Sequence, residues 1–148
     1  MYCASLRRLA AYDISAATPR LVAETDTPAP SGGERLAWKQ MFVDAARDRV
    51  MIGRDVYDAR TGRSGGTRIG AGQKVFANDD QRGVYWTATV ADELIAVHTL
   101  DRTSLAVIDT QELGAADYLA PGLAVDSAGG RLYVSHFTAA TVDIYRIA

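Results

Sequence analysis

The chain has 148 residues, 48% of them apolar, and a formal net charge of −2. This composition predicts one globular domain with a buried core, and it argues against a disordered chain or a nucleic-acid-binding protein. The single cysteine, Cys3, excludes an internal disulfide and a cysteine-based zinc site. We expect no membrane span, because no apolar run reaches 18 residues, and residues 1–15 do not have the pattern of a signal peptide.

Charge is spread unevenly along the sequence. Residues 1–74 carry 12 Lys or Arg against 8 Asp or Glu, whereas residues 75–148 carry 4 against 10. One interpretation is a polar partner surface on each half. The other, which we favour, is that the halves pack together or only differ in their solvated faces.

Three segments share one β-hairpin pattern, namely VDAARDRVMI (43–52), ANDDQRGVYW (77–86) and VDSAGGRLYV (125–134). Seven positions separate the Asp or Asn that opens each turn from a Met or Tyr in the next strand. The pairs are Asp44 and Met51, Asn78 and Tyr85, and Asp126 and Tyr133. A short Asp or Asn side chain closes such a turn by accepting a hydrogen bond from a nearby backbone N–H. The constant offset therefore indicates a structural repeat.

A third-strand pattern follows each hairpin, in LAAYDIS (9–15), DVYDARTG (55–62), LAVIDTQ (105–111) and TVDIYRIA (141–148). Weaker fourth strands are predicted at 20–25, 67–70 and 115–119. Residues 2–5 resemble the second strand of a copy that has no first strand. The markers at positions 2, 51, 85 and 133 are about 44 residues apart on average, a spacing typical of four-stranded propeller blades.

The third copy is ambiguous. Tyr85 and Ile108 are separated by 23 positions, more than the equivalent residues of the other copies. Either a hairpin is inserted there, or Leu94–Leu100 is the third strand and Ser104–Asp109 the fourth; we slightly favour the insertion. Residues 26–38, rich in Pro, Gly and Ser, are predicted to connect the first two blades.

The segments YCAS, GVYWTA and RLYVSHF, with the strands that end in YDIS, VIDT and DIYRI, resemble YVTN-type β-propeller repeats. RVMIG and His136 depart from that pattern. VYDARTG is similar to a turn of quinoprotein propellers, but the other hallmarks of that family and of WD-repeat (WD40-like) proteins are missing. The resemblance implies a periplasmic or secreted parent chain, and it leaves the compartment of this chain open.

The predicted fold class is all-β: a β-propeller-like arc of four-stranded antiparallel blades. The approximate blades are 1–27, 38–70, 73–119 and 122–148 of a single domain. Fourteen strands, in groups of three, four, four and three, make about three and a half blades. Such an arc is incomplete and has two open sheet edges. We expect another propeller segment, a protein partner or a second copy to complete it. The alternative is that residues 2–5 and 141–148 share one blade of a closed four-blade ring.

Six residues are candidates for a ligand site. His98 and His136 are predicted near strand ends at the propeller face where ligands usually bind, and Asp101 and Arg54 are predicted to lie near them. Such a group could bind a metal or exchange protons. The favoured alternative is that both histidines are strand-end residues with satisfied hydrogen bonds. Trp38 and Phe137 are candidates for an aromatic binding surface.

The other motifs favour structure over chemistry. Asp79 and Asp80 could bind Ca²⁺, but a solvated turn is the favoured interpretation. The glycine-rich stretches 64–66 and 70–72 lack the strand-to-helix context of a phosphate loop. We therefore predict no catalytic residues, no metal site and no cofactor. The favoured function is a non-catalytic module for binding or scaffolding; the alternative is a fragment of a lactonase-like or quinoprotein-dehydrogenase-like propeller enzyme.

Overall fold

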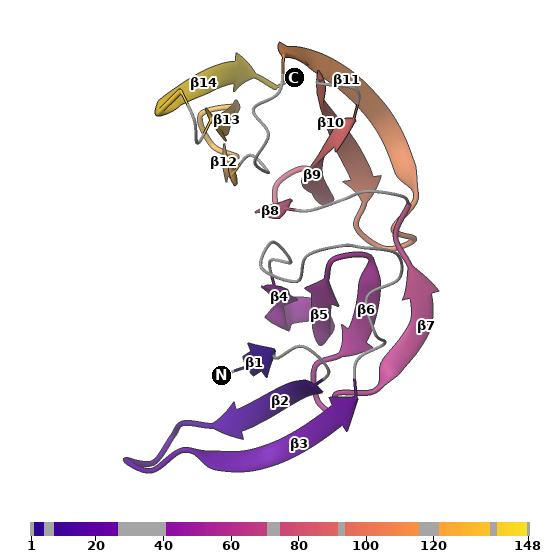
Figure 1. The fold of residues 1–148 in the computed structure, drawn as a ribbon, viewed down its shortest axis with the longest axis vertical. Coiled ribbons are helices and arrows are strands. Elements are labelled where there is room, and N and C mark those ends of the chain that lie inside the picture. The colour runs from indigo at the N-terminus through magenta and orange to yellow at the C-terminus, as the bar shows by residue number, and fades with distance from the viewer. Residues whose placement is uncertain are drawn as a thin grey trace. The chain divides into compact units, whose positions relative to one another are not determined.

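The computed structural model describes residues 2–4, 8–26, 41–70, 75–91, 94–115, 122–136 and 139–147. Within these residues the chain forms fourteen β-strands in four antiparallel sheets and one short 3₁₀ turn (Figure 1). None of the described helical segments is long and apolar enough to cross a membrane. The chain divides into two compact units, Met1–Arg68 and Ile69–Ala148, which are described separately.

The first unit contains two sheets, each an antiparallel meander in chain order. The first sheet has three strands: β1 (Tyr2–Ala4), β2 (Arg8–Asp13) and β3 (Arg20–Asp26). The second has four: β4 (Met41–Asp44), β5 (Arg49–Ile52), β6 (Asp55–Asp58) and β7 (Ser64–Arg68), with the turn η2 (Ala45–Arg47) between β4 and β5. Leu9 of the first sheet packs with Val50, Ile52 and Tyr57 of the second, and this contact forms the core of the unit.

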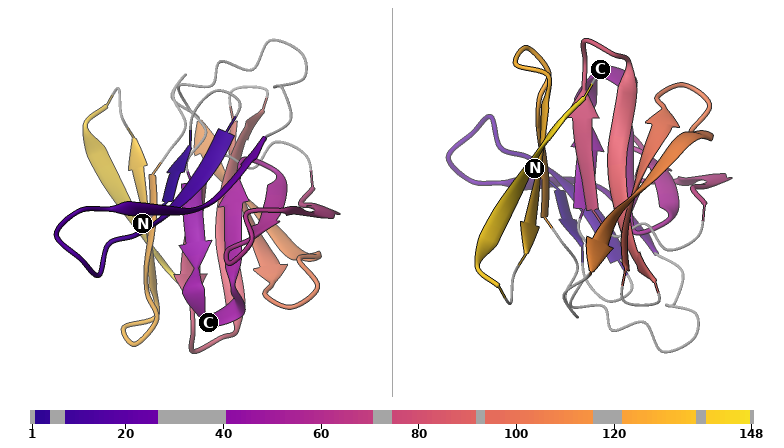
Figure 2. Two further views of the ribbon diagram at one scale, coloured as in Figure 1. Left: turned by 90° about the horizontal axis from the view of Figure 1, so that it is seen from below. Right: turned by 90° about the horizontal axis from the view of Figure 1, so that it is seen from above.

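The second unit repeats this arrangement with four and then three strands. Its first sheet contains β8 (Val75–Asp79), β9 (Val84–Ala91), β10 (Leu94–Asp101) and β11 (Val107–Ala115). Its second contains β12 (Gly122–Asp126), β13 (Arg131–His136) and β14 (Thr141–Arg146). Figure 2 shows these two twisted sheets beside each other in its view from above, pink to orange and light orange to yellow.

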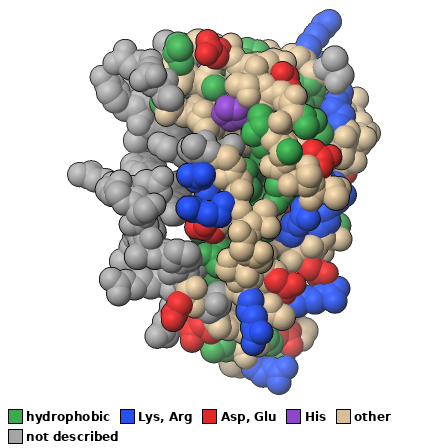
Figure 3. All heavy atoms as spheres, turned by 90° about the vertical axis from the view of Figure 1, so that its right-hand side faces the viewer, with side chains coloured by type: hydrophobic (Ala, Val, Ile, Leu, Met, Phe, Trp, Pro, Cys, Tyr) green, Lys and Arg blue, Asp and Glu red, His purple; other side chains and the backbone are tan. Residues whose placement is uncertain are grey.

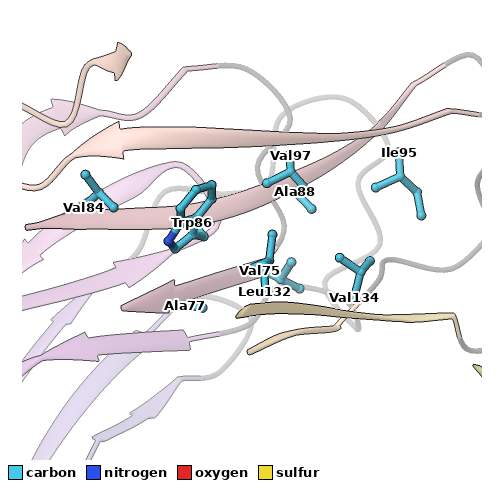
Figure 4. Packing of buried hydrophobic residues seen from close by; sticks show 9 residues of the cluster. All are labelled: Val75, Ala77, Val84, Trp86, Ala88, Ile95, Val97, Leu132 and Val134. Carbon is cyan, nitrogen blue, oxygen red and sulfur yellow. The ribbon is translucent and has the colours of Figure 1, made fainter. Parts of the chain in front are cut away.

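The core of the second unit lies between its two sheets. Seven of its buried residues come from β8, β9 and β10, and Leu132 and Val134 come from β13 (Figure 4). Every second residue of each strand reaches this core, because side chains alternate between the faces of a strand. Burial of each aliphatic side chain contributes roughly 1.5–3 kcal/mol relative to exposure. The packing of β12 and β13 onto the preceding sheet is therefore the main stabilising contact of this unit.

The prediction of an all-β chain with three, four, four and three strands is confirmed within the described residues. The slightly favoured insertion in the third copy is wrong. Leu94–Asp101 pairs with β9 along its whole length and with β11 on its other side, so it is the third strand, and Val107–Ala115 is the fourth. The segment LAVIDTQ matches the third-strand pattern only because alternating apolar and polar residues also occur in a fourth strand.

Two other boundaries differ from the prediction. The fourth strand of the second sheet begins at Ser64 and ends at Arg68, which is earlier than the predicted range 67–70. Its two glycines, Gly65 and Gly66, do not prevent pairing with β6, although the register shifts there. Residues 27–38 of the connector predicted at 26–38 lie outside the described residues, and so do residues 116–119 of the fourth strand predicted at 115–119.

The register of the three hairpins corrects the alignment of the third copy. Each hairpin closes with an Asp paired to the residue five positions later: Asp44 with Arg49, Asp79 with Val84, and Asp126 with Arg131. The residue before each closing partner has a positive φ, 51° at Asp48, 67° at Gly83 and 61° at Gly130. The turn residue of the third copy is thus Asp79 and not Asn78. Trp86, not Tyr85, is equivalent to Met51 and Tyr133, because a shift of one residue moves side chains to the other face.

The last strands of the first and third sheets, β3 and β11, share an irregularity. In β3 the register skips Val22, and in β11 it skips Ile108, each opposite the junction of two residues near the end of the third strand. Both extra residues are exposed, 52% for Val22 and 60% for Ile108. A β-bulge of this kind bends the outer strand and disturbs its free edge.

Candidate functional site

Asp101 closes the turn between β10 and β11. Its Oδ1 atom accepts hydrogen bonds from the backbone N–H of Thr103 and Ser104, at 3.1 and 2.7 Å, and from the Ser104 hydroxyl at 2.7 Å. Asp58 does the same between β6 and β7, where its Oδ1 atom accepts the N–H groups of Arg60 and Thr61 and the Thr61 hydroxyl. The hydrogen bonds from Thr61 lower the pKa of Asp58. Asp101 is therefore the turn-forming residue of its copy, and its carboxylate is engaged within the turn.

The same turns are tied to the hairpins. Ala59 N–H donates to the Asp48 carbonyl at 2.7 Å, and Arg102 N–H donates to the Gly83 carbonyl at 3.2 Å. In the last sheet Ile147 N–H donates to the Gly130 carbonyl at 3.0 Å. Each of these carbonyls belongs to a residue with positive φ. One hydrogen bond therefore joins the hairpin turn to the residue that follows the last residue of β6, β10 or β14 in each of these three sheets.

His98 lies within β10, not at its end, and this corrects the predicted position. Its Nε2 atom is 2.9 Å from the Thr89 hydroxyl, and its Nδ1 atom is 2.9 Å from the Thr110 hydroxyl. Because a hydroxyl can donate or accept, these two threonines satisfy either neutral tautomer of the ring. Burial lowers the pKa of His98 below its ordinary value of 6.5. The ring is thus placed between hydroxyls from the two neighbouring strands of its own sheet.

His136 lies at the last position of β13 and has a different set of neighbours. Its Nε2 atom is 3.1 Å from Asp143 Oδ2, and the Tyr145 hydroxyl donates to the same oxygen at 3.2 Å. Burial and the nearby Asp143 raise the pKa of Tyr145. His136 and His98 therefore belong to two separate hydrogen-bonded groups on different sheets.

The three remaining candidates are Arg54, Trp38 and Phe137. Arg54 lies beside Gly53, whose φ is 59°, in the tight turn between β5 and β6 of the other unit. Trp38 and Phe137 lie outside the described residues. Within the described part of the chain, no group of three or more His, Cys, Asp or Glu side chains has a geometry that could hold a metal ion.

Two arginines that the sequence analysis did not select make several polar contacts in the second unit. Arg82 Nη1 donates to Asp79 Oδ2 at 3.2 Å and to the Ser127 carbonyl at 3.3 Å, while Nη2 donates to the Ile147 carbonyl at 3.2 Å. Arg82 thereby joins the turn of β8 and β9 to the last sheet. Arg102, which is 4% exposed, pairs with Asp80 and lies over the Tyr85 ring, 5.5 Å from its centre.

These arginines explain the Asp79–Asp80 pair without a calcium ion. Burial alone raises the pKa of Asp79, but hydrogen bonds from Arg82 N–H, Ser127 and the Trp86 indole hold the pKa below its ordinary value. Trp86 Nε1 lies 3.4 Å from Asp79 Oδ2. Each carboxylate has an arginine partner, so the pair is part of the structure of the turn. The sequence signal is the Arg three residues after Asp79, which Arg47 repeats after Asp44 at 3.5 Å.

The most informative surface is one face of the β12–β14 sheet, which we call the terminal face. It carries Ala124, Tyr133, Ser135, Val142 and Ile144, because these residues lie directly opposite one another in the register of the three strands. Val142 is 58% exposed and Ile144 is 61% exposed. The other face of the same sheet packs on the core through Leu132 and Val134.

Most of the equivalent positions in the earlier sheets are buried, Arg54 of the second sheet being half-buried. Four strands occupy the third place of the repeat, β2 among them because its sheet lacks a first strand within the described part of the chain. These strands, β2, β6, β10 and β14, end at Asp13, Asp58, Asp101 and Arg146. Four residues before the end, Leu9 is 1% and Val97 is 3% exposed, against 58% for Val142. Two residues before the end, the exposures are 6%, 6% and 8% for Ala11, Val56 and Thr99, against 61% for Ile144. The terminal face is thus a repeat surface that nothing covers among the described residues.

Other exposed apolar residues are more scattered. Figure 3 shows one face of the molecule, where hydrophobic side chains reach the surface in small groups among charged ones. Val22 and Ile108 of the bulges are examples of exposed apolar residues outside the terminal face. Single exposed apolar residues are normal in soluble proteins, whereas a contiguous group on one sheet marks an interaction surface.

Comparison with known proteins identifies the fold. No protein-family model matches the sequence, and no curated protein matches it. A solved structure described as "Structure of Dos1 propeller" matches with a TM-score of 0.62 at 15% sequence identity over 94% of this chain. The chain therefore has a β-propeller fold, built of antiparallel sheets of up to four strands. It spans 39% of the length of that structure, and the YVTN type of its repeats stays a prediction.

Proposed function

We propose that this chain is a non-catalytic β-propeller module that binds a protein partner through the terminal face. The observation that supports this function is the exposure of Val142 and Ile144 at positions that are buried in the other sheets. Exposed aliphatic side chains lose contact with water when a partner covers them, and each Å² of apolar surface buried contributes about 25 cal/mol. A face that is regular, apolar and uncovered therefore favours a macromolecular partner over a small polar ligand.

The candidate residues for chemistry have structural partners. The Asp101 carboxylate is used in a turn, and the two histidines are hydrogen-bonded within separate sheets. A general acid or base must reach a substrate proton, and a metal site needs convergent ligands. These contacts support a binding role for the module, with its fold serving to present surfaces.

The test compares three purified forms of the full chain. Wild type, Ile144→Asp and Ile108→Asp are tagged and used to capture proteins from the source cells, and each captured protein is purified and measured again by titration calorimetry. Ile108 is a matched control because its exposure, 60%, is nearly that of Ile144. We expect a partner that binds wild type and Ile108→Asp but binds Ile144→Asp at least tenfold more weakly.

An enzymatic role would give a different result. Wild type would turn over a lactone, or an alcohol in the presence of a quinone cofactor, and a His98→Ala/His136→Ala double variant would lose that turnover. Turnover of this kind, together with partner binding that is indifferent to Ile144, would overturn the proposal.

A further inference from the structure

We infer that the partner of the terminal face is a second copy of this chain, which docks its own β1–β3 sheet there in a head-to-tail contact. This inference deepens the proposed function and rests on it, since both use the same face. It is argued from the way in which sheets pack inside each unit, from the residues that the first sheet offers, and from the charge of the two units.

Both units use one packing rule between successive sheets. The residue just before the end of the third strand is Tyr57 in β6 and Tyr145 in β14. Tyr57 packs with Leu9 of the preceding sheet, and Tyr145 packs on the cluster that contains Val97 of the preceding sheet. In each unit a tyrosine from one sheet thus packs in or on the cluster that contains the aliphatic residue four positions before the strand end in the sheet before it. Val142 holds that aliphatic position in the last sheet and is 58% exposed.

The first sheet holds the matching residue. Tyr12 is the residue before the end of β2, so it occupies the position of Tyr57 and Tyr145. Leu21 lies directly opposite Tyr12 in β3 and is 49% exposed. Leu9, by contrast, points to the other face and is used inside its own unit. The first sheet therefore presents a tyrosine–leucine face of the kind that packs on an aliphatic face elsewhere in the molecule.

The charges of the two units are complementary. Residues 1–68 carry 11 Lys or Arg against 8 Asp or Glu, a net charge of +3, and residues 69–148 carry 5 against 10, a net charge of −5. A contact between the first unit of one copy and the second unit of another brings opposite charges together. A contact between two second units would bring two net negative charges together, so the charges favour a head-to-tail contact over a symmetric one.

The test is a complementation experiment on two variants of the full chain. Ile144→Asp removes the terminal face but keeps Tyr12, and Tyr12→Ser removes the docking residue but keeps the terminal face. Sedimentation velocity is measured from roughly 1 to 500 µM, the range of weak contacts, with circular dichroism as the check of folding and Ile108→Asp as the control. A second pair, Val142→Ser and Leu21→Ser, replaces any variant that does not fold.

We expect wild type and Ile108→Asp to associate as concentration rises, and each single variant to remain monomeric. An equimolar mixture of the two variants should form a dimer, because one intact terminal face and one intact first sheet remain in the pair. Association of wild type should weaken as salt is raised, since opposite charges are screened.

Three results would overturn the inference. They are a wild type that is monomeric at every concentration, an Ile144→Asp variant that associates like wild type, and a mixture of variants that stays monomeric. A monomeric wild type that still captures a different protein through Ile144 would overturn self-association and leave the proposed function intact. Loss of both would overturn the two together.

Discussion

The β8–β11 and β12–β14 sheets have the same register but different surroundings. Val97 and Val142 occupy one equivalent position, and Thr99 and Ile144 occupy another, yet the first of each pair is buried and the second is exposed. The difference does not come from the strands themselves, which alternate in the same way. The difference comes from the next sheet. The β12–β14 sheet covers the face of β10 that carries Val97 and Thr99, whereas no sheet covers the terminal face among the described residues. In a repeat fold of this kind, the burial of a residue depends on whether a neighbouring sheet packs on its face.

The largest effect is expected from one charge placed at each of these positions. Val97→Asp buries a carboxylate without a partner and should lower the free energy of unfolding by more than ~4 kcal/mol, enough to unfold the second unit. Val142→Asp should change it by less than ~0.5 kcal/mol, because the side chain stays in water. Urea denaturation of both variants measures the difference. Equal losses would mean that the terminal face is covered.

The next effect concerns the side chain that joins the two sheets. Arg82→Met removes three hydrogen bonds and leaves the fully buried Asp79 without its cation, so we expect a loss of roughly 2–3 kcal/mol. Because the pKa of Asp79 is lowered in the folded chain, its contribution is present above the unfolded pKa and is lost as the pH falls through the folded value. Arg82→Met should flatten the acid limb of stability against pH. An unchanged acid limb would contradict this role of the pair.

The turns at the strand ends give a smaller and paired effect. Asp101→Ala and Asp58→Ala each remove the acceptor of the turn, and each should lower the midpoint of thermal or urea unfolding. Arg146 holds the same position in the last sheet, so Arg146→Ala is the control and should cost less than ~0.5 kcal/mol. A loss of ligand binding or activity without loss of stability in Asp101→Ala would contradict its assignment as a turn residue.

A stabilising substitution is expected at Thr87. Its side chain is fully buried, and its hydroxyl has no hydrogen-bond partner among the described residues. Val134 holds the equivalent position in the last sheet, four residues after Gly130 as Thr87 is after Gly83. Thr87→Val keeps the volume and removes the unsatisfied hydroxyl, so it should raise stability by up to ~1 kcal/mol. Calorimetry checks the sign, with Thr67→Val in the exposed strand β7 as the control.

The smallest expected effect is the contribution of His98 to the pH dependence of stability. Asp143 holds the equivalent position in the last sheet. Because burial lowers the pKa of His98 in the folded chain, the unfolded chain binds the proton more readily. Stability should therefore fall as the pH is lowered through 6.5, the unfolded value, and this slope should disappear in His98→Gln. Ring-proton titration by NMR measures the folded pKa directly. A folded value above 6.5 would contradict the effect of burial.

The fold was more predictable from sequence than the site was. Alternation and the Asp-containing turns locate nearly every strand, because these patterns are local. Two predictions for the third copy were wrong, the turn residue and the third strand, and both errors have local causes. Asn78 and Asp79 are adjacent residues that can both open a turn, and VHTLD and LAVID both satisfy the third-strand pattern. A clearer signal was available in Asp58-x-x-Thr61 and Asp101-x-x-Ser104, which mark the same turn.

The candidate site could not be predicted because its properties depend on distant contacts. Nothing in the segment TVDIYRIA separates an exposed Ile144 from a buried one, since its exposure depends on whether another sheet packs on that face. Likewise His98 is satisfied by Thr89 and Thr110, which lie nine residues before and twelve after it. Such partners are known only when the strand register is known.

The bulges at Val22 and Ile108 have a consequence for how such a chain can change in length. A bulged outer strand is a poor template for a foreign strand, so each sheet that ends in one is insulated against fusing with its neighbours in solution. Duplication or deletion of a whole sheet would then change the number of exposed sheet faces without creating a new strand edge that pairs with other chains. The β-bulge that exposes one apolar side chain therefore also allows the whole sheet to be duplicated without promoting edge-to-edge aggregation.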